Sequence, residues 1–156
     1  MLGNTYEMQN CSAARALEIV GERWSLLILR DALFRGFTRF SDFQRSLAIA
    51  PNVLAKRLDG FVIGGLLVRG KGRDPEAQHH YTPTEMGMGL KPVIIALTDW
   101  GDRWRAPNGP PVEFQHEGCG GRIKLLTRCS KCGISPRPRE IAAIPIGQPR
   151  RRSRRP

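Results

Sequence analysis

Apolar positions in the first third of the chain repeat at helical spacing. Between Cys11 and Val20 they share one face of a 3.6-residue period, at Ala13, Ala16, Leu17 and Val20. This pattern predicts a helix that ends at Gly21. Residues 24–34 are apolar nearly all round near their middle, so we expect a second helix there, in the centre of the core.

Residues 40–63 predict two short helices joined by a tight turn. Residues 40–47 carry apolar side chains on one face, and an amphipathic helix follows the turn at 48–50. Pro51 suits the first position of that second helix, and Gly64 ends it. Two residues are candidate N-terminal caps of the first helix: Thr38 and Ser41.

A β-hairpin is expected next, with strands at residues 66–69 and 79–82 around a loop of turn formers and cations. Helix, turn, basic helix and strand is the order of a winged helix-turn-helix, whose second helix enters the DNA major groove. A generic helical hairpin with no role in DNA binding is the alternative for the two helices. A solvated surface turn is the alternative for the basic loop of the β-hairpin. His79 and His80 are expected to be strand residues, because no Cys or carboxylate spacing around them indicates a metal site.

The longest helix is expected over residues 84–104. Its apolar seam runs over four turns through Leu90, Val93, Ile94, Leu97, Trp100 and Trp104. Pro92 marks either a kink or the true start of this helix. The seam suits the chain's own core or a second subunit, and periodicity alone favours the core.

Composition and charge add a class of partner. The chain has 156 residues and is 40% hydrophobic, enough for one domain with a small appendix. It has neither an apolar run long enough to span a membrane nor a secretory signal, so a cytoplasmic protein is expected. The net charge of +11 sits in residues 35–74, which carry +5, and in residues 137–156, which carry +6. A basic segment that coincides with a candidate DNA-reading element favours nucleic acid as the partner.

The C-terminal part carries the spacing H-x2-C-x9-C-x2-C after a Pro- and Gly-rich linker at 106–111. Its four donors form the set that a structural Zn²⁺ requires: His116, Cys119, Cys129 and Cys132. We therefore expect a zinc ribbon over residues 112–134, with a hairpin at 122–128. A Cys129/Cys132 redox pair and free thiols are the alternatives, and the role of the ribbon stays open.

Residues 135–156 are Pro- and Arg-rich and are expected to be a disordered basic tail that attracts phosphates or merely solvates the protein.

Cys11 stands apart from that set. A thiol at a helix N-terminus can have a lowered pKa, and its thiolate is the reactive form. Cys11 is therefore either a redox or electrophile sensor or a small residue packed in an interface.

Taken together, residues 11–105 resemble the HxlR-type winged-helix transcription regulators of bacteria. No single motif is specific, but the ordered set is: Cys11, Gly21, Trp24, Arg39, Phe40, Phe43, Asn52, Val53, Leu54, Arg57, Leu58, Gly65, Leu66, Leu67, Tyr81, Thr84, Gly87, Leu90, Lys91, Pro92, Val93, Leu97, Trp100 and Gly101. Two departures touch the packing of the wing: residues 61–64 are more apolar than usual, and Pro83 stands where leucine is common. The resemblance implies a homodimer built through the terminal helices and a pseudo-palindromic operator. The family contains both repressors and activators, and we favour a repressor here. Several members respond to electrophiles or oxidants through a cysteine at the position that Cys11 occupies.

The expected DNA contacts divide into two groups. Asn52 and Lys56 are expected at base edges, with Ala55 or Val53 against a thymine methyl group. Phosphate contacts are expected from Arg39, Arg45, Arg57, Lys71 and Arg73.

The sequence therefore predicts a mainly α protein with a small β-wing, a winged helix-turn-helix of α+β type. Its expected function is sequence-specific, dimeric DNA binding. The alternative is a zinc-ribbon protein that binds nucleic acids without sequence choice. An enzyme that uses Cys129 and Cys132 is disfavoured, because no cofactor loop, activated nucleophile or carboxylate pair accompanies them.

Overall fold

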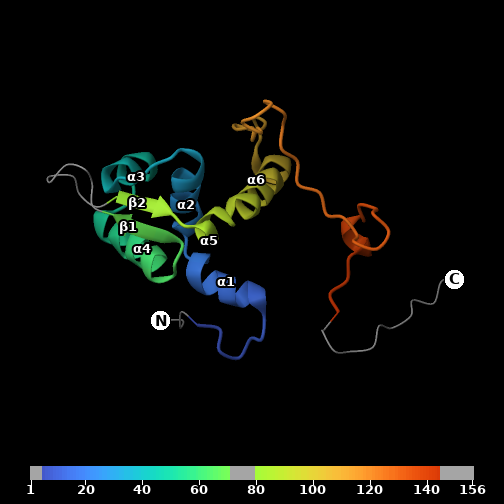
Figure 1. The fold of residues 1–156 in the computed structure, drawn as a ribbon, viewed down its shortest axis with the longest axis horizontal. Coiled ribbons are helices and arrows are strands. Elements are labelled where there is room, and N and C mark those ends of the chain that lie inside the picture. Colours follow the sequence, from blue (N-terminus) through green and yellow to red (C-terminus); the bar gives the residue numbers. More distant parts are fainter. Residues whose placement is uncertain (1–4, 71–79, 145–156) are drawn as a thin grey trace. The chain divides into compact units, whose positions relative to one another are not determined.

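The computed structural model describes residues 5–70 and 80–144. The chain divides into two units, Met1–Val112 and Glu113–Pro156. The elements of the first unit are labelled in Figure 1: α1 (Ser12–Val20), α2 (Ser25–Phe34), α3 (Phe40–Leu47), α4 (Pro51–Ile63), β1 (Leu67–Gly70), β2 (His80–Pro83), α5 (Glu85–Met88) and α6 (Lys91–Arg105). No helix in these described ranges is long and apolar enough to cross a membrane.

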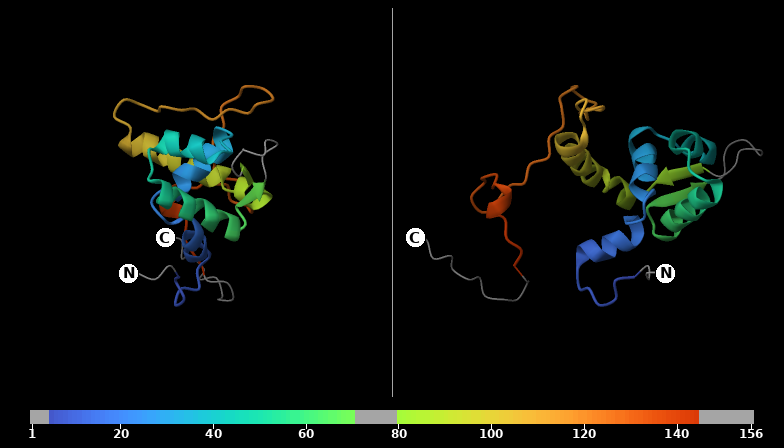
Figure 2. Two further views of the ribbon diagram at one scale, coloured as in Figure 1. Left: turned by 90° about the vertical axis from the view of Figure 1, so that its left-hand side faces the viewer. Right: turned by 180° about the vertical axis from the view of Figure 1, so that it is seen from behind.

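Helix α2 forms the centre of the core, as its nearly uniform apolar character predicts. Ile28 and Leu29 are fully buried, and Phe43 of α3 is buried with them. Residues from α4, β1 and β2 complete the cluster: Leu54, Leu58, Phe61, Leu67 and Tyr81. This core holds α3 on α2, and α4 on α3 and alongside β1 (Figures 1 and 2).

The hairpin pairs antiparallel, with Leu67 opposite Pro83 and Gly70 opposite His80. A single bridge between Arg39 and His80 adds the segment before α3 to the edge of β2. Lys71 and Arg73, expected at the tip of the hairpin, lie outside the described residues, as does His79. His80 is a strand residue, as predicted.

Neither expected cap of α3 is found. Arg39 occupies the N-cap position, and no side chain closes a capping hydrogen bond there. The Thr38 hydroxyl lies 3.0 Å from Nδ1 of His80 instead, so it ties the start of α3 to the wing.

The single helix expected over 84–104 is two helices. Thr84 caps α5 by accepting a 3.0 Å hydrogen bond from the Gly87 amide, and α6 then begins at Lys91 with Pro92 in its first turn. Pro92 therefore marks a true helix start, where its missing N–H costs nothing.

The apolar seam of α6 is not packed in the chain's own core, contrary to the expectation from periodicity. Ile94 and Ile95 are its buried residues, whereas Val93, Leu97, Trp100 and Trp104 are 49–60% exposed. The expected face of α1 behaves similarly: Val20 is buried, but Leu17 is 49% exposed. No described residue of this chain covers these exposed side chains, so they are accessible to a partner.

The second unit has little regular structure in its described part. Residues 114–116 pair with 121–123 through single hydrogen bonds, and the hairpin expected at 122–128 is not formed. Within the segment expected to be disordered, Pro138–Glu140 forms one 3-10 turn, closed by the side chains of Arg137 and Glu140. The last twelve residues, 145–156, lie outside the described ranges.

Candidate nucleic-acid interface

The turn between α3 and α4 sets the direction of the second helix. Ala48 adopts a left-handed conformation with φ 49°, which ends α3. Ile49 is 4% exposed and anchors the turn in the core. Pro51 then starts α4 with its fixed φ, as the sequence predicts.

Helix α4 has a buried face and an exposed face. Leu54, Leu58 and Phe61 pack into the core, whereas Asn52 and Lys56 are exposed. These two residues stand four positions apart, one turn along the outer face of the helix. The structure therefore brings the two expected base-reading side chains together on a surface that no described part of the chain covers. Ala55 and Val53, expected against a thymine methyl group, are half-buried at the sides of α4.

Arg57 does not share this outer face. Its guanidinium lies 3.1 Å from a carboxylate oxygen of Glu22, and the side chain is only 21% exposed. This ion pair connects α4 to the loop after α1. The phosphate contact expected of Arg57 stays a prediction, and phosphate would have to compete with Glu22 for the guanidinium.

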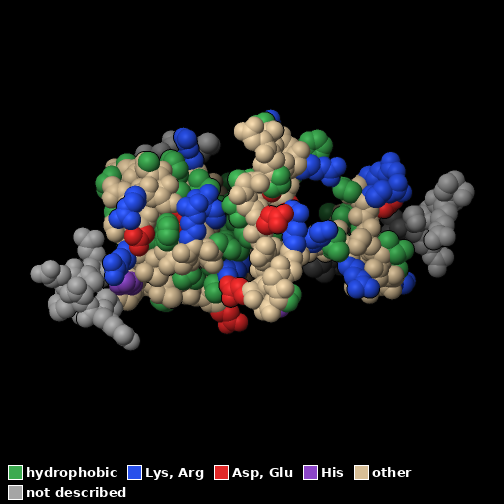
Figure 3. Space-filling model, turned by 90° about the horizontal axis from the view of Figure 1, so that it is seen from above, with side chains coloured by type: hydrophobic (Ala, Val, Ile, Leu, Met, Phe, Trp, Pro, Cys, Tyr) green, Lys and Arg blue, Asp and Glu red, His purple; other side chains and the backbone are tan. Residues whose placement is uncertain are grey.

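The other expected phosphate contacts are accessible where they are described. Arg39 is exposed at the start of α3, and Arg45 is 78% exposed with only a 3.7 Å ion pair to Asp42. Figure 3 shows several separate groups of Lys and Arg side chains on the surface of the first unit. Exposed, weakly paired arginines are suited to contact phosphates.

Sequence reasoning missed two further arginines near this surface. Arg35 lines a hollow of about 270 Å³ together with Arg45 and Ser46. Arg69 of β1 pairs with Asp59 of α4 and stacks over the Tyr81 ring at 5.5 Å. Neither has a motif of its own, since the first follows a helix end and the second is an ordinary strand position.

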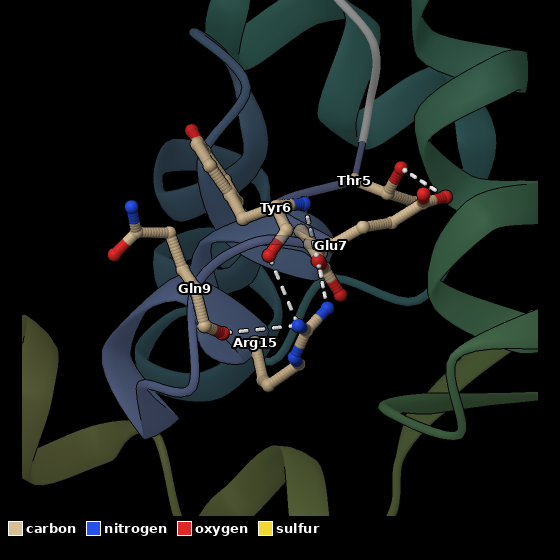
Figure 4. A network of polar contacts seen from close by, with 6 residues as sticks. Thr5, Tyr6, Glu7, Gln9 and Arg15 are labelled. Atoms are coloured by element: carbon tan, nitrogen blue, oxygen red, sulfur yellow. Dashed lines mark hydrogen bonds and ion pairs between the residues drawn. The ribbon is translucent and has the colours of Figure 1, made fainter.

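Cys11 is exposed at the N-cap of α1. The backbone N–H of Ala14 and then that of Ala13 lower the pKa of its thiol, although no capping hydrogen bond closes. Next to it, the N-terminal segment folds back on α1 (Figure 4): Arg15 donates to the carbonyl oxygens of Tyr6 and Gln9, both at 3.0 Å. The thiol is thus accessible, and its pKa lies below the ordinary value.

The four expected zinc donors form two local pairs. Nδ1 of His116 lies 3.3 Å from Sγ of Cys119, and Cys129 and Cys132 flank a second tight turn. No three His, Cys, Asp or Glu side chains gather in one place in the described part of the chain. The arrangement therefore presents two donor pairs rather than one cluster.

Comparison with known proteins gives a consistent assignment. Residues 19–109 match the HxlR-like helix-turn-helix family. Rv3095 of Mycobacterium tuberculosis (strain ATCC 25618 / H37Rv), an uncharacterized HTH-type transcriptional regulator, is 39% identical over 143 residues, which cover 90% of this chain and 89% of the relative. This match is longer than the family segment, so it includes part of the C-terminal extension.

Solved structures agree. PA1607, a candidate transcription factor, superposes with a TM-score of 0.78 at 32% identity, covering 89% of this chain and 97% of that chain. The reduced form of the transcriptional regulator YodB from B. subtilis gives a TM-score of 0.53 at 26% identity, covering 64% of this chain and 99% of that chain. The chain therefore belongs to the HxlR-like helix-turn-helix family, a family of transcriptional regulators and not of enzymes.

Proposed function

We propose that the protein is a sequence-specific repressor that binds a pseudo-palindromic operator as a homodimer. The observation that carries this proposal is the exposed pair Asn52 and Lys56 on the outer face of α4, beside a buried face that fixes the helix on the core. Asn reads adenine and Lys reads guanine in the major groove by hydrogen bonds to base edges.

The exposed apolar faces support the dimer. Val93, Leu97, Trp100 and Trp104 line one side of α6, and Leu17 lies on α1. Large aromatic side chains at this exposure lose much unfavourable contact with water when a partner covers them. Two copies joined through these helices would present two α4 helices to half-sites about 34 Å apart.

Regulation through Cys11 is the second part of the proposal. The solved structures of the relative YodB include a reduced form and a quinone-bound form. In this chain the thiol of Cys11 is exposed and has a lowered pKa, as the reactive form requires. We propose that electrophiles or oxidants modify Cys11 and change DNA affinity.

Fluorescence anisotropy on the duplex upstream of the protein's own gene, and on a scrambled duplex, tests the main proposal. We expect at least about a thousandfold preference at physiological salt. Asn52→Ala should weaken the specific complex by about tenfold or more and leave scrambled DNA unaffected, since only base readout is lost. Asn108→Ala, the same change in the exposed linker, should alter neither.

Salt dependence separates phosphate contacts from base contacts. Arg45→Ala should weaken binding to all duplexes about equally and reduce the salt slope by about 0.9. Arg57→Ala should leave that slope unchanged, because in the unmodified protein the Arg57 guanidinium is paired with Glu22. A lower slope would mean that Arg57 leaves Glu22 to contact phosphate. If the unmodified protein binds the upstream and the scrambled duplex equally well, non-specific nucleic-acid binding replaces the proposal. If Cys11→Ser keeps the full response to oxidants and electrophiles, the sensor role is wrong.

A further inference from the structure

We propose that His116, Cys119, Cys129 and Cys132 hold one structural zinc ion, which folds the C-terminal extension. The inference goes beyond the DNA-binding function and does not depend on it. It rests on the backbone of two loops, on the donors that they carry and on the absence of buried side chains among the described residues 113–144.

The two loops have the same hydrogen-bond pattern. In the first, the His116 amide donates to the Gly121 carbonyl at 2.8 Å, and the Gly120 amide donates back to the His116 carbonyl at 2.8 Å. In the second, the Cys129 amide donates to the Ile134 carbonyl at 2.9 Å, and the Gly133 amide donates back to the Cys129 carbonyl at 2.9 Å. Each loop therefore closes between the first donor and the residue five positions later.

Both loops also place a glycine with positive φ at the same position. Gly120 has φ +70° and Gly133 has φ +72°, and each directly follows the second donor of its loop. A side chain is disfavoured at these angles, so glycine lets the chain reverse there at no steric cost. The two loops share their hydrogen bonds, their positive-φ glycine and the spacing of their donors, although their other residues differ. This likeness indicates that both loops present metal ligands.

The donor spacing in the first loop fits one ion. Two ligands at tetrahedral angles, with Zn–N near 2.1 Å and Zn–S near 2.3 Å, lie about 3.6 Å apart. Nδ1 of His116 and Sγ of Cys119 lie 3.3 Å apart, so a small outward shift of one side chain would admit the ion between them. One imidazole and three thiolates fill a tetrahedral site and leave no open position, so the ion is structural.

The extension has no core of its own among its described residues. Over 113–144 no side chain is buried, and residues such as Phe114 and Ile123 are only half-buried. Small units that cannot bury apolar surface are usually stabilised by disulfides, a metal or oligomerisation, and the donor set of this unit favours the metal. The nine residues between Cys119 and Cys129 can span about 30 Å, ample to bring the two preformed loops to one ion.

Metal content of the full-length protein, purified with reductant and dialysed against metal-free buffer, tests the proposal. We expect one zinc per chain by mass spectrometry. Cobalt added to metal-free protein should give the intense visible bands and the thiolate charge-transfer band of tetrahedral coordination, which zinc then bleaches at one equivalent.

Matched variants assign the donors. Cys119→Ser and Cys129→Ser, one from each loop, should each abolish the tetrahedral cobalt spectrum, while Cys11→Ser should keep it. Circular dichroism checks that the helices of the first unit are retained. The proposal is overturned by less than about a tenth of a zinc per chain with an octahedral cobalt spectrum, or by an unchanged spectrum in Cys129→Ser. A reversible Cys129–Cys132 disulfide in protein that binds no zinc would overturn it in favour of a redox pair.

Discussion

The Ser46 hydroxyl of α3 donates a 2.6 Å hydrogen bond to Oδ2 of Asp31, a fully buried carboxylate of α2. The other oxygen of Asp31 accepts from Arg30 at 2.9 Å. Arg35 joins the group through a 2.8 Å bond to Ser46. A buried charge is tolerated only when it is paired and hydrogen-bonded. The pair therefore fixes α3, the first helix of the reading element, on the central helix of the core.

Ser46→Ala should lower the free energy of unfolding by about 1–3 kcal/mol, because it leaves one oxygen of the buried Asp31 carboxylate without its partner. Urea denaturation measures the change. Ser41→Ala, the same substitution at an exposed position of α3, is the control and should change stability by less than about 0.5 kcal/mol. Equal effects of the two substitutions would mean that the Asp31 contact adds nothing.

Gly87→Ala should destabilise the first unit strongly. A Cβ at this position would stand 2.2 Å from the carbonyl oxygen of Leu66, so the backbone of α5 or of the chain before β1 must move. Overpacking of this kind costs about 1–3 kcal/mol or more. Thermal unfolding of the variant tests this.

The control for Gly87 is Gly60→Ala in α4, where an added Cβ meets no atom within 4 Å. That change should raise stability by about 1 kcal/mol, since alanine favours helix over glycine. An equally mild effect at Gly87 would refute the close approach of α5 to Leu66.

Leu97→Lys should convert the proposed dimer to monomer. Leu97 is 51% exposed in the seam of α6, and a charge buried there in an interface would lack a partner. Sedimentation velocity at micromolar concentration gives the mass. Asp99→Lys introduces the same lysine on the same helix outside the seam and should leave the dimer intact. A dimer that survives in Leu97→Lys would show that the contact lies elsewhere.

Cys11 should react with iodoacetamide at lower pH than an ordinary thiol. The N–H groups of Ala14 and Ala13 lower its pKa, so half of the thiol is ionised at a lower pH than for an unperturbed cysteine. Because only the thiolate attacks iodoacetamide, the alkylation rate of Cys11 should begin to rise at a lower pH than that of an ordinary thiol. Peptide-resolved mass spectrometry across a pH series follows Cys11 separately from the other cysteines. An inflection at or above the ordinary value contradicts the prediction.

The sequence by itself determined most of the local structure. Helix ends at Gly21 and Gly64 follow from the low helix propensity of glycine, and the start of α4 at Pro51 follows from the fixed φ of proline. The antiparallel pairing of the two wing strands agrees with the turn formers between them in the sequence. The exposed pair Asn52 and Lys56 was also predictable, because the buried positions of α4 fix which face remains outside. Such features depend on neighbours along the chain, which the sequence displays directly.

Tertiary structure alone decided which partner each surface meets. Periodicity showed that Leu97 and Trp100 share a face, but not that the core ends before it reaches them. The same holds for Arg57, which is bound by Glu22 from a distant segment, and for Thr38, which contacts His80 instead of capping α3. The close approach of the Gly87 backbone to the Leu66 carbonyl oxygen is likewise a contact between distant segments. These outcomes depend on which segments meet in space, and a one-dimensional pattern specifies faces without specifying what covers them.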